Sequence, residues 1–268
     1  MVPEISPVRG DRVGPGPEAP KVIEARGLAM RFGANTVFRD VEFDVRKGEV
    51  FVILGGSGSG KSTLLALLIG LRQPSAGSIT VLGEDLLAAR GEARRRLKQR
   101  FGVMFQQGAL FGSMTLAENV ALPLESFTDL PAEAIGEIAR AKLGMVGLGD
   151  AAEKLPAEIS GGMVKRAAIA RAMALDPPLL FLDEPSAGLD PITSAGLDRL
   201  ILALAEGLGI TFVIVTHELD SILTVADRVI MLDKAAQGVI AAGDPRALRA
   251  TSTHPTVRAF FNRIAEAA

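Results

Sequence analysis

Nine consecutive residues, Gly55 to Thr63, have the composition and spacing of a phosphate-binding loop. They fit the pattern Gly-x4-Gly-Lys-Ser/Thr. Glycines let such a loop curl with its backbone N–H groups turned inward toward phosphate oxygens, and the lysine adds a positive charge. We therefore expect the loop to bind a nucleoside triphosphate through all of its residues, which are Gly55, Gly56, Ser57, Gly58, Ser59, Gly60, Lys61, Ser62 and Thr63.

The flanking sequence strengthens this prediction. The continuous apolar run at 50–54 precedes the loop and is typical of a buried parallel strand. Leucines at helical spacing follow it, so a helix should begin near Lys61 and offer its free N-terminal amides to phosphate. A Gly/Ser-rich turn alone is common, but a strand, a lysine-serine pair and a helix together predict nucleotide binding.

A second apolar strand, at 179–182, ends in the paired carboxylates Asp183 and Glu184. Because it would deliver Asp183 to the edge of the sheet that carries the loop, Asp183 could hold magnesium there. Glu184 points elsewhere and could polarise the attacking water. Two acids at a strand end are by themselves a weak indication of a catalytic site. Together with the phosphate-binding loop they favour that function.

A third motif, Ser160-Gly161-Gly162, precedes a helix rich in alanine and arginine. Ser160 is a natural N-cap, and the two glycines expose amides at the helix N-terminus. The motif predicts a second anion site, although a capped Gly-Gly turn taken alone is usually structural.

Composition limits the other classes of function. The 268 residues are 48% hydrophobic but only 4% aromatic, which suits an aliphatic α/β core. A net charge of −2 argues against a nucleic-acid partner. Without cysteine there is no thiolate metal site or cysteine nucleophile. We expect neither a membrane span nor a signal sequence, and hence a cytosolic protein or one held at a membrane by a partner.

The rest of the chain divides by composition. We expect a disordered Pro/Gly-rich tail at 1–20, short strands with antiparallel pairing from Val22 to about 82, and helices from Thr115 to about 155, interrupted at Pro123. The basic helix at 88–100 is either a solvated face or a partner surface. The apolar face of Val257, Phe260, Phe261 and Ile264 fits an interface or packing on the chain's own core.

Six motifs in order resemble those of the nucleotide-binding subunits of ATP-binding cassette (ABC) transporters. The resemblance covers residues 22–243 and joins the loop, Gln106, Ser160-Gly161-Gly162, Asp183-Glu184, a segment ending at Asp190, and His217. It implies an α/β fold, a P-loop NTPase core of the ABC type with a mostly parallel sheet flanked by helices. It also implies an N-terminal antiparallel β subdomain and an inserted α-helical subdomain at about 106–165. The ATPase domain would span 21–243 and a C-terminal helical extension 244–268.

The resemblance also implies roles for single residues. Phe32 would stack on adenine, although core packing is the alternative. His217 would contact the γ-phosphate and hold Glu184 in position. The catalytic set implied is Glu184, His217, Gln106 and Lys61. Magnesium would be held by Ser62, Gln106 and Asp183. Ser160, Gly161, Gly162 and Asp190 would add further ATP contacts.

In this family two copies face each other head to tail. Ser160 and Gly162 of one copy would then cap the γ-phosphate held by the other, so ATP favours the closed dimer and hydrolysis opens it. A separate membrane permease would receive the motion, with a cytoplasmic helix in a groove beside Gln106.

Within the family, the segments at 105–111 and 115–124, Met163 in place of the usual glutamine, and the ending Val257 to Phe261 resemble the Mla/Mce-type lipid transport systems. This implies ATP-driven phospholipid trafficking between inner and outer membranes from the cytoplasmic face of the inner membrane. STAS-domain and Mce-type lipid-binding subunits would be partners.

Two other functions keep the same motifs. One is another ABC importer, for amino acids or ions. The other is a soluble ABC ATPase for repair or translation, which the absence of sustained heptads between Lys61 and Ile159 and the presence of a single cassette disfavour. A regulatory subunit with a dead site is disfavoured because the residues of an active site are all present, namely Lys61, Asp183, Glu184 and His217.

Overall fold

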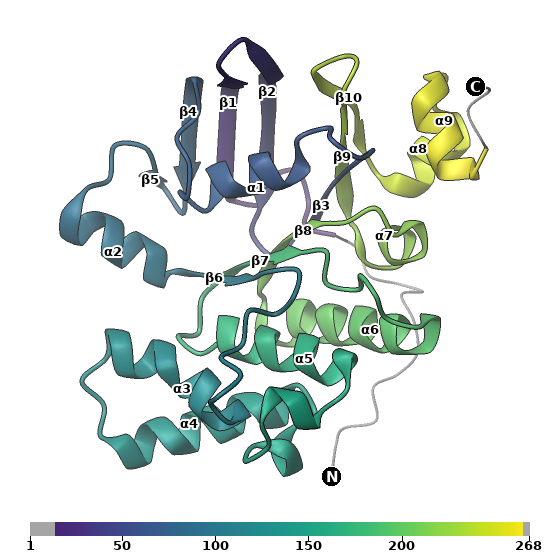
Figure 1. Cartoon of the computed structure of the whole chain (residues 1–268). Helices are drawn as coiled ribbons and strands as arrows, with labels where there is room; N and C mark the ends of the chain where they lie inside the picture. Colours follow the sequence, from purple (N-terminus) through teal and green to yellow (C-terminus); the bar gives the residue numbers. More distant parts are fainter. Residues whose placement is uncertain (1–13, 265–268) are drawn as a thin grey trace.

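The computed structural model describes residues 14–264, which form two sheets flanked by helices (Figure 1). The strands are β1 Lys21–Phe32, β2 Asn35–Arg46, β3 Val50–Gly55, β4 Ala76–Val81, β5 Glu84–Asp85, β6 Phe101–Met104, β7 Leu179–Asp183, β8 Thr211–Val215, β9 Arg228–Asp233 and β10 Gly238–Gly243. The helices are α1 Lys61–Leu68, α2 Gly91–Gln99, α3 Leu116–Phe127, α4 Ala132–Met145, α5 Gly161–Ala172, α6 Pro191–Leu208, α7 Leu219–Val225, α8 Pro245–Thr251 and α9 Pro255–Asn262, with 3-10 turns at Gly149–Ala151 and Pro156–Glu158.

The larger sheet has the strand order β10-β9-β3-β8-β7-β6. Its neighbouring strands run parallel except at the β9–β10 edge. The smaller sheet, β2-β1-β4-β5, is antiparallel. This arrangement confirms the predicted α/β core with an antiparallel β subdomain.

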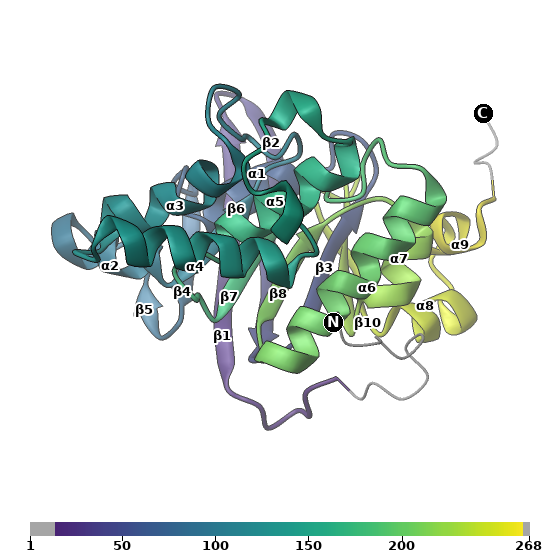
Figure 2. The same ribbon diagram turned by 90° about the horizontal axis from the view of Figure 1, so that it is seen from below.

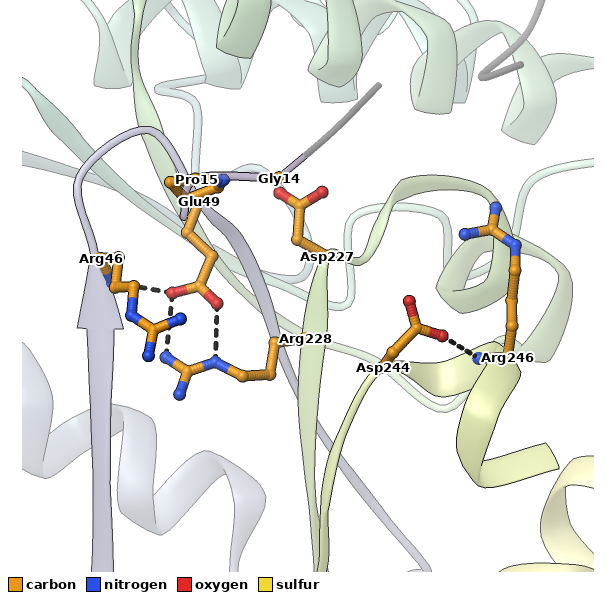
Figure 3. A pocket seen from close by; sticks show the side chains of 8 residues that line it. All are labelled: Gly14, Pro15, Arg46, Glu49, Asp227, Arg228, Asp244 and Arg246. Atoms are coloured by element: carbon orange, nitrogen blue, oxygen red, sulfur yellow. Dashed lines mark hydrogen bonds and ion pairs between the residues drawn. The ribbon is translucent and has the colours of Figure 1, made fainter. Parts of the chain in front are cut away.

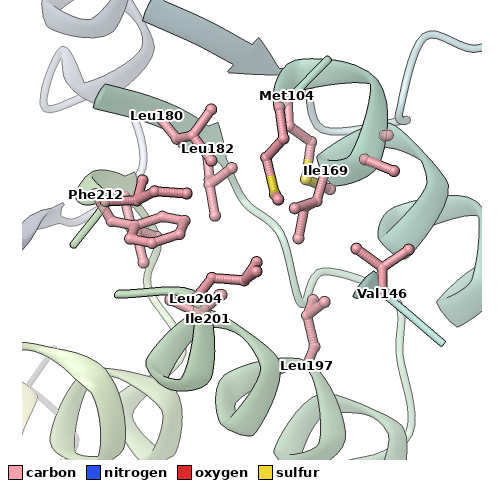
Figure 4. Packing of buried hydrophobic residues seen from close by; sticks show 14 of the residues in the cluster. Met104, Val146, Ile169, Leu180, Leu182, Leu197, Ile201, Leu204 and Phe212 are labelled. Carbon is pink, nitrogen blue, oxygen red and sulfur yellow. The ribbon is translucent and has the colours of Figure 1, made fainter. Parts of the chain in front are cut away.

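Alternate residues of the parallel strands belong to two separate hydrophobic cores. Val52 of β3 faces a core shared with α3, α5 and α6, while Ile53 faces a core shared with α1 and the smaller sheet. Figure 4 shows part of the first core, which includes Leu182 and Phe212 of the sheet and Ile201 and Leu204 of α6. Successive strand residues point to opposite faces of a sheet. One set packs with α1 and the other with α5, so these two helices lie on opposite sides of the larger sheet (Figures 1 and 2).

Helix α3 corrects one expectation. Pro123 lies inside α3 rather than interrupting the helical region. A capping box between Thr115 and Glu118 fixes the start of the helix, and buried Val120 and Leu124 pack on either side of the proline along one face. Burial of that face outweighs the backbone hydrogen bond that proline cannot make.

The C-terminal helix packs on its own chain. Val257 and Phe261 of α9 are fully buried in the core that contains α6, with Phe260 packed against them, while Ile264 remains 56% exposed. Own-core packing therefore accounts for the paired phenylalanines. Arg263 also pairs with Asp220 of α7 at 2.8 Å.

Arginines of the basic helix contact other parts of the chain. In α2, Arg94 donates to the carbonyl of Gly70 at 2.6 Å and Arg95 lies over the Phe127 ring, so these arginines serve contacts within the chain.

Of the tail predicted at 1–20, residues 14–20 are described, and Lys47 N donates to Pro20 O at 2.8 Å. The remainder of the predicted tail, 1–13, lies outside the described residues.

Candidate active site

The loop after β3 has a backbone that its glycines make possible. Gly55 has a φ of +153°, and a Cβ there would lie 2.3 Å from the carbonyl oxygen of Leu232. Gly60, which precedes α1, has a φ of +98° and faces Val37, where a Cβ would lie 2.7 Å from Cγ1. Neither position has room for a side chain, so the loop requires glycine at both ends.

The Lys61 ammonium is hydrogen-bonded to the backbone of this loop. Its Nζ donates to the carbonyls of Gly55 at 2.8 Å and Gly56 at 3.1 Å. Burial lowers the pKa of Lys61, and the carboxylates of Glu184 and Asp183 oppose that shift. The contacts place a positive charge over the curled backbone, where the phosphates of a nucleotide would lie.

Asp183 ends β7, the strand two positions from β3 in the sheet. Burial raises the pKa of its carboxyl group, the charge of Glu184 adds to the rise, and Lys61 and Lys165 oppose it. Its Oδ1 is buried without a hydrogen-bond partner among the described residues. A buried carboxylate oxygen in this state is suited to a cation or an ordered water.

Glu184 leaves the strand in a left-handed conformation, with a φ of +46°. Such a backbone is unfavourable for a residue with a side chain. Oε1 of Glu184 lies 2.9 Å from Nδ1 of His217, which follows β8. Oε2 is buried with no partner in the described part of the chain.

The pair is half open to solvent. The Glu184 side chain is 11% exposed and the His217 side chain 57% exposed. On its other side, Nε2 of His217 lies 3.9 Å from Oε1 of Glu218. One carboxylate oxygen is therefore held by the imidazole while the other is available to accept a proton or orient water.

Two residues assigned by resemblance have exposed side chains. The Gln106 side chain is exposed, and its backbone carbonyl accepts a hydrogen bond from the Lys165 ammonium. The Phe32 ring is 43% exposed with the Arg72 guanidinium 5.2 Å from its centre. The partial exposure of Phe32 is compatible with stacking on a base and differs from the buried side chain that pure core packing would give.

The oxygen groups at this site fit magnesium. Ser62 is exposed at the first turn of α1, and Asp183 supplies a buried unpartnered oxygen. Magnesium prefers such hard oxygen donors and keeps waters and substrate phosphates in its shell. Among the described residues no group of three His, Asp or Glu side chains could hold a metal ion alone, so phosphate oxygens would have to complete the coordination.

The third motif begins α5. Ser160 Oγ accepts from Met163 N at 3.3 Å as the N-cap, and Gly162 is buried against Thr193 of α6, where a Cβ would lie 2.4 Å from Cγ2. Asp190 caps α6 and accepts from Thr193 Oγ1 at 2.5 Å, and these hydrogen bonds lower its pKa. The third motif and the Asp190 segment therefore meet in one chain, whereas α1, which follows the loop, packs on the other face of the larger sheet.

Lys165 was not among the predicted site residues. It is buried in α5, and its ammonium lies 3.4 Å from the carbonyl of Glu184 as well as on that of Gln106. The sequence did contain a signal for this residue. Lys165 lies on the same helical face as Ala168 and Ile169, and a lysine on an apolar face needs polar partners inside the protein.

A separate polar pocket of about 190 Å³ lies where β2, β9 and α8 approach one another (Figure 3). Arg228 is paired with Glu49 there at 2.8 Å, and Glu49 also accepts from the backbone N–H of Arg46 at 2.7 Å. These contacts join the two sheets, and the pocket contains none of the predicted site residues.

A glycine-rich loop between a buried parallel strand and a helix, beside a strand that ends in two carboxylates, defines a P-loop nucleoside triphosphatase. The family model described as ABC transporter matches residues 38–187. This chain therefore belongs to the ABC transporter family, as an ATP-binding and ATP-hydrolysing subunit.

Two curated relatives match most of the chain. The probable ribonucleotide transport ATP-binding protein mkl of Mycobacterium leprae is 44% identical over 240 residues, covering 90% of this chain and 68% of that protein. The intermembrane phospholipid transport system ATP-binding protein MlaF of Escherichia coli is 39% identical over 245 residues, covering 91% of this chain and 90% of MlaF. The chain thus spans about two thirds of the mycobacterial relative but nearly all of MlaF.

A solved structure shares the fold. The dimeric post-hydrolysis state of the ATP-binding cassette MJ0796 bound to ADP and Pi has a TM-score of 0.74 and 29% identity, covering 83% of this chain and 98% of that one. Within residues 14–264, none of the helices is long and apolar enough to cross a membrane.

Proposed function

We propose that this chain is the ATPase subunit of a transporter that moves phospholipid or a related lipid between inner and outer membranes. The observation that carries the proposal is the 39% identity to MlaF, which extends over nine tenths of both chains. A match of this extent includes the helical region at 106–165, where a membrane partner would be contacted, as well as the nucleotide site.

The site suggests how each residue would act. The loop from Gly55 to Thr63 holds the phosphates, Ser62, Gln106 and Asp183 hold magnesium, and Phe32 stacks on the adenine. Magnesium would neutralise charge on the phosphates. Glu184 polarises the attacking water through the oxygen that His217 leaves free.

A second copy would complete this site. The loop leads into α1 and the Ser160-Gly161-Gly162 motif begins α5, and these two helices pack on opposite faces of the larger sheet. This separation supports a site in which the loop and the motif around one nucleotide come from different subunits. In a head-to-tail dimer, Ser160 and Gly162 of one copy would contact the γ-phosphate held by the other. The dimeric form of the MJ0796 cassette supports this arrangement. ATP then stabilises the closed dimer, and hydrolysis releases it.

The motion would be delivered to a separate permease. We infer that the chain sits on the cytoplasmic face of the inner membrane through that permease, together with STAS-domain and Mce-type lipid-binding subunits. The lipid is cargo of the assembly and would not contact the ATPase.

The mycobacterial relative favours a second candidate, a transporter whose cargo is a ribonucleotide. The ATPase mechanism would be unchanged, because cargo choice belongs to the permease. The lower coverage of that relative, 68%, makes it the weaker guide.

One experiment separates these functions. The tagged full chain is purified from detergent-solubilised native membranes, and co-purifying proteins and lipids are identified by mass spectrometry. We expect a permease, an Mce-type subunit and phospholipid, together with Mg-dependent ATP hydrolysis by the purified complex. A nucleotide or amino-acid permease without lipid-transfer partners would exclude the lipid proposal and leave the ATPase intact.

A further inference from the structure

A buried lysine joins the segments that follow two neighbouring strands. Lys165 in α5 is 7% exposed. Its ammonium donates to the backbone carbonyl of Gln106, which follows β6, and lies 3.4 Å from the backbone carbonyl of Glu184, which follows β7. These two residues are far apart in sequence, and Lys165 reaches them from a third element.

The ammonium has carbonyls rather than a carboxylate as its direct partners. Burying a charge is costly, so an ammonium at this depth needs strong compensation. The negative charges of Glu184 and Asp183 stabilise it from nearby. The lysine therefore depends on the same carboxylates that the site uses, and it restrains the backbone that carries one of them.

A second side chain of α5 holds the same segment. Arg171 donates to the carbonyl of Gly108 at 2.8 Å and to that of Ala109 at 2.7 Å. Gly108 has a φ of +76° and packs beside Val164. The stretch from Gln106 to Ala109 is thus fastened to α5 at both ends, whereas the Glu184 backbone is reached by Lys165.

We propose that Lys165 is a positioning residue for ATP hydrolysis, which ties the backbones of Gln106 and Glu184 to the helix that begins with the Ser160-Gly161-Gly162 motif. This inference rests on the roles proposed above for Gln106 and Glu184. In the dimer, the motif of one copy would meet ATP bound by the second copy. The position that α5 takes on that ATP would then set, through Lys165, the position of the water-polarising carboxylate of Glu184 in the first copy. Hydrolysis becomes efficient only after the two copies have closed.

The test compares buried lysines. K165M removes the donor and keeps the aliphatic stem. The matched control is K142M, because Lys142 is also buried, at 4% exposed, but its ammonium pairs with Asp176 away from the site. For each variant of the full chain we would measure the thermal midpoint, the affinity for a fluorescent ATP analogue, and kcat and KM for ATP.

We expect K165M to lower kcat by about 10- to 100-fold, the scale of a small misplacement of a catalytic group, while KM and analogue affinity change less than about threefold. K142M should keep the wild-type kcat at a comparable loss of thermal midpoint. K165R, which restores a positive donor, should recover part of kcat.

Two results would overturn the inference: a wild-type kcat in K165M, with or without a raised KM, or the same loss of kcat in K142M. If K165M does not fold, K165Q carries the test, because its shorter donor should lower kcat at unchanged affinity. A wild-type kcat in K165Q would then reject the inference. Failure of the proposed function is seen separately, as a membrane purification that returns no lipid-transfer partners while the kinetic comparison of the lysine variants stays unchanged.

Discussion

Nδ1 of His217 lies 2.9 Å from Oε1 of Glu184, and the other oxygen of that carboxylate, Oε2, is buried with no partner among the described residues. The contact depends on two features that are far apart in sequence. Glu184 leaves β7 with a φ of +46°, and His217 follows β8, the neighbouring strand. The geometry orients the carboxylate through one oxygen and leaves the second for water.

We predict that E184Q binds ATP but hydrolyses it about 100- to 10,000-fold more slowly, because an amide cannot accept a proton from water. ATP-bound protein should then accumulate as a dimer, observed by size-exclusion chromatography with magnesium and ATP. The matched control is E218Q, which alters the carboxylate on the other side of the same imidazole and should keep the wild-type rate. Wild-type turnover in E184Q would show that another group polarises the water.

We predict that H217A lowers kcat by about 100-fold with a smaller change in KM, since Glu184 loses the group that orients it. The sequence has one other histidine, His254, whose side chain caps no helix, and H254A should be neutral. Steady-state ATPase assays of both variants test this. Equal rates for H217A and H254A would contradict the role of the contact.

We predict that K61A weakens ATP binding by roughly 10- to 150-fold, the range expected for loss of charge-assisted hydrogen bonds to phosphate. Fluorescence titration with an ATP analogue measures the change. The control is K154A, since Lys154 is exposed and lies outside the site. Unchanged affinity in K61A would mean that the ammonium keeps its bonds to Gly55 and Gly56 when nucleotide is bound.

We predict that G162A destabilises the fold by about 1–3 kcal/mol, because the added methyl would overlap Cγ2 of Thr193. Replacing that threonine by serine removes Cγ2 and keeps the hydroxyl that bonds Asp190. The double variant G162A/T193S should therefore regain most of the stability in urea unfolding. G161A is the control, because a Cβ at Gly161 would meet only Leu189 at 3.8 Å. Equal losses in the single and double variants would contradict the steric explanation.

We predict that the stability of the chain falls as pH rises from about 4 to about 6 because of Asp198. Burial raises the pKa of this carboxyl to about 6, a hydroxyl hydrogen bond from Ser221 opposes the rise, and the charges of Asp220 and Glu218 add to it. The folded state thus keeps a proton that the unfolded state has released, and this stabilisation is lost as pH rises through the folded pKa.

The variant D198N tests this prediction, since it cannot ionise. Its stability relative to wild type should increase between pH 4 and pH 7 by on the order of 2–3 kcal/mol. Unfolding free energies measured across that range give the comparison. A difference that does not depend on pH would show that Asp198 titrates normally.

The nucleotide site could be predicted from the sequence because its chemistry depends on local order. Gly55 and Gly60 lie at fixed spacing from Lys61, and an apolar run before them determines a buried strand. The pair Asp183-Glu184 could be assigned for the same reason. These features require only neighbours along the chain and predicted an α/β core. The antiparallel subdomain was predicted from the short strands between Val22 and about 82 and from the family resemblance.

Other features depended on packing between distant segments. Pro123 remained inside α3 because burial of a helical face outweighed its local preference, and Phe261 packed on its own core rather than forming an interface. The sequence likewise did not single out Lys165 or Asp198, whose burial is imposed by neighbouring elements. The contact between Glu184 and His217 and the contacts of Lys165 with two backbone carbonyls form only because parallel strands bring their carboxyl ends to one edge of the sheet. That arrangement is a property of the tertiary structure.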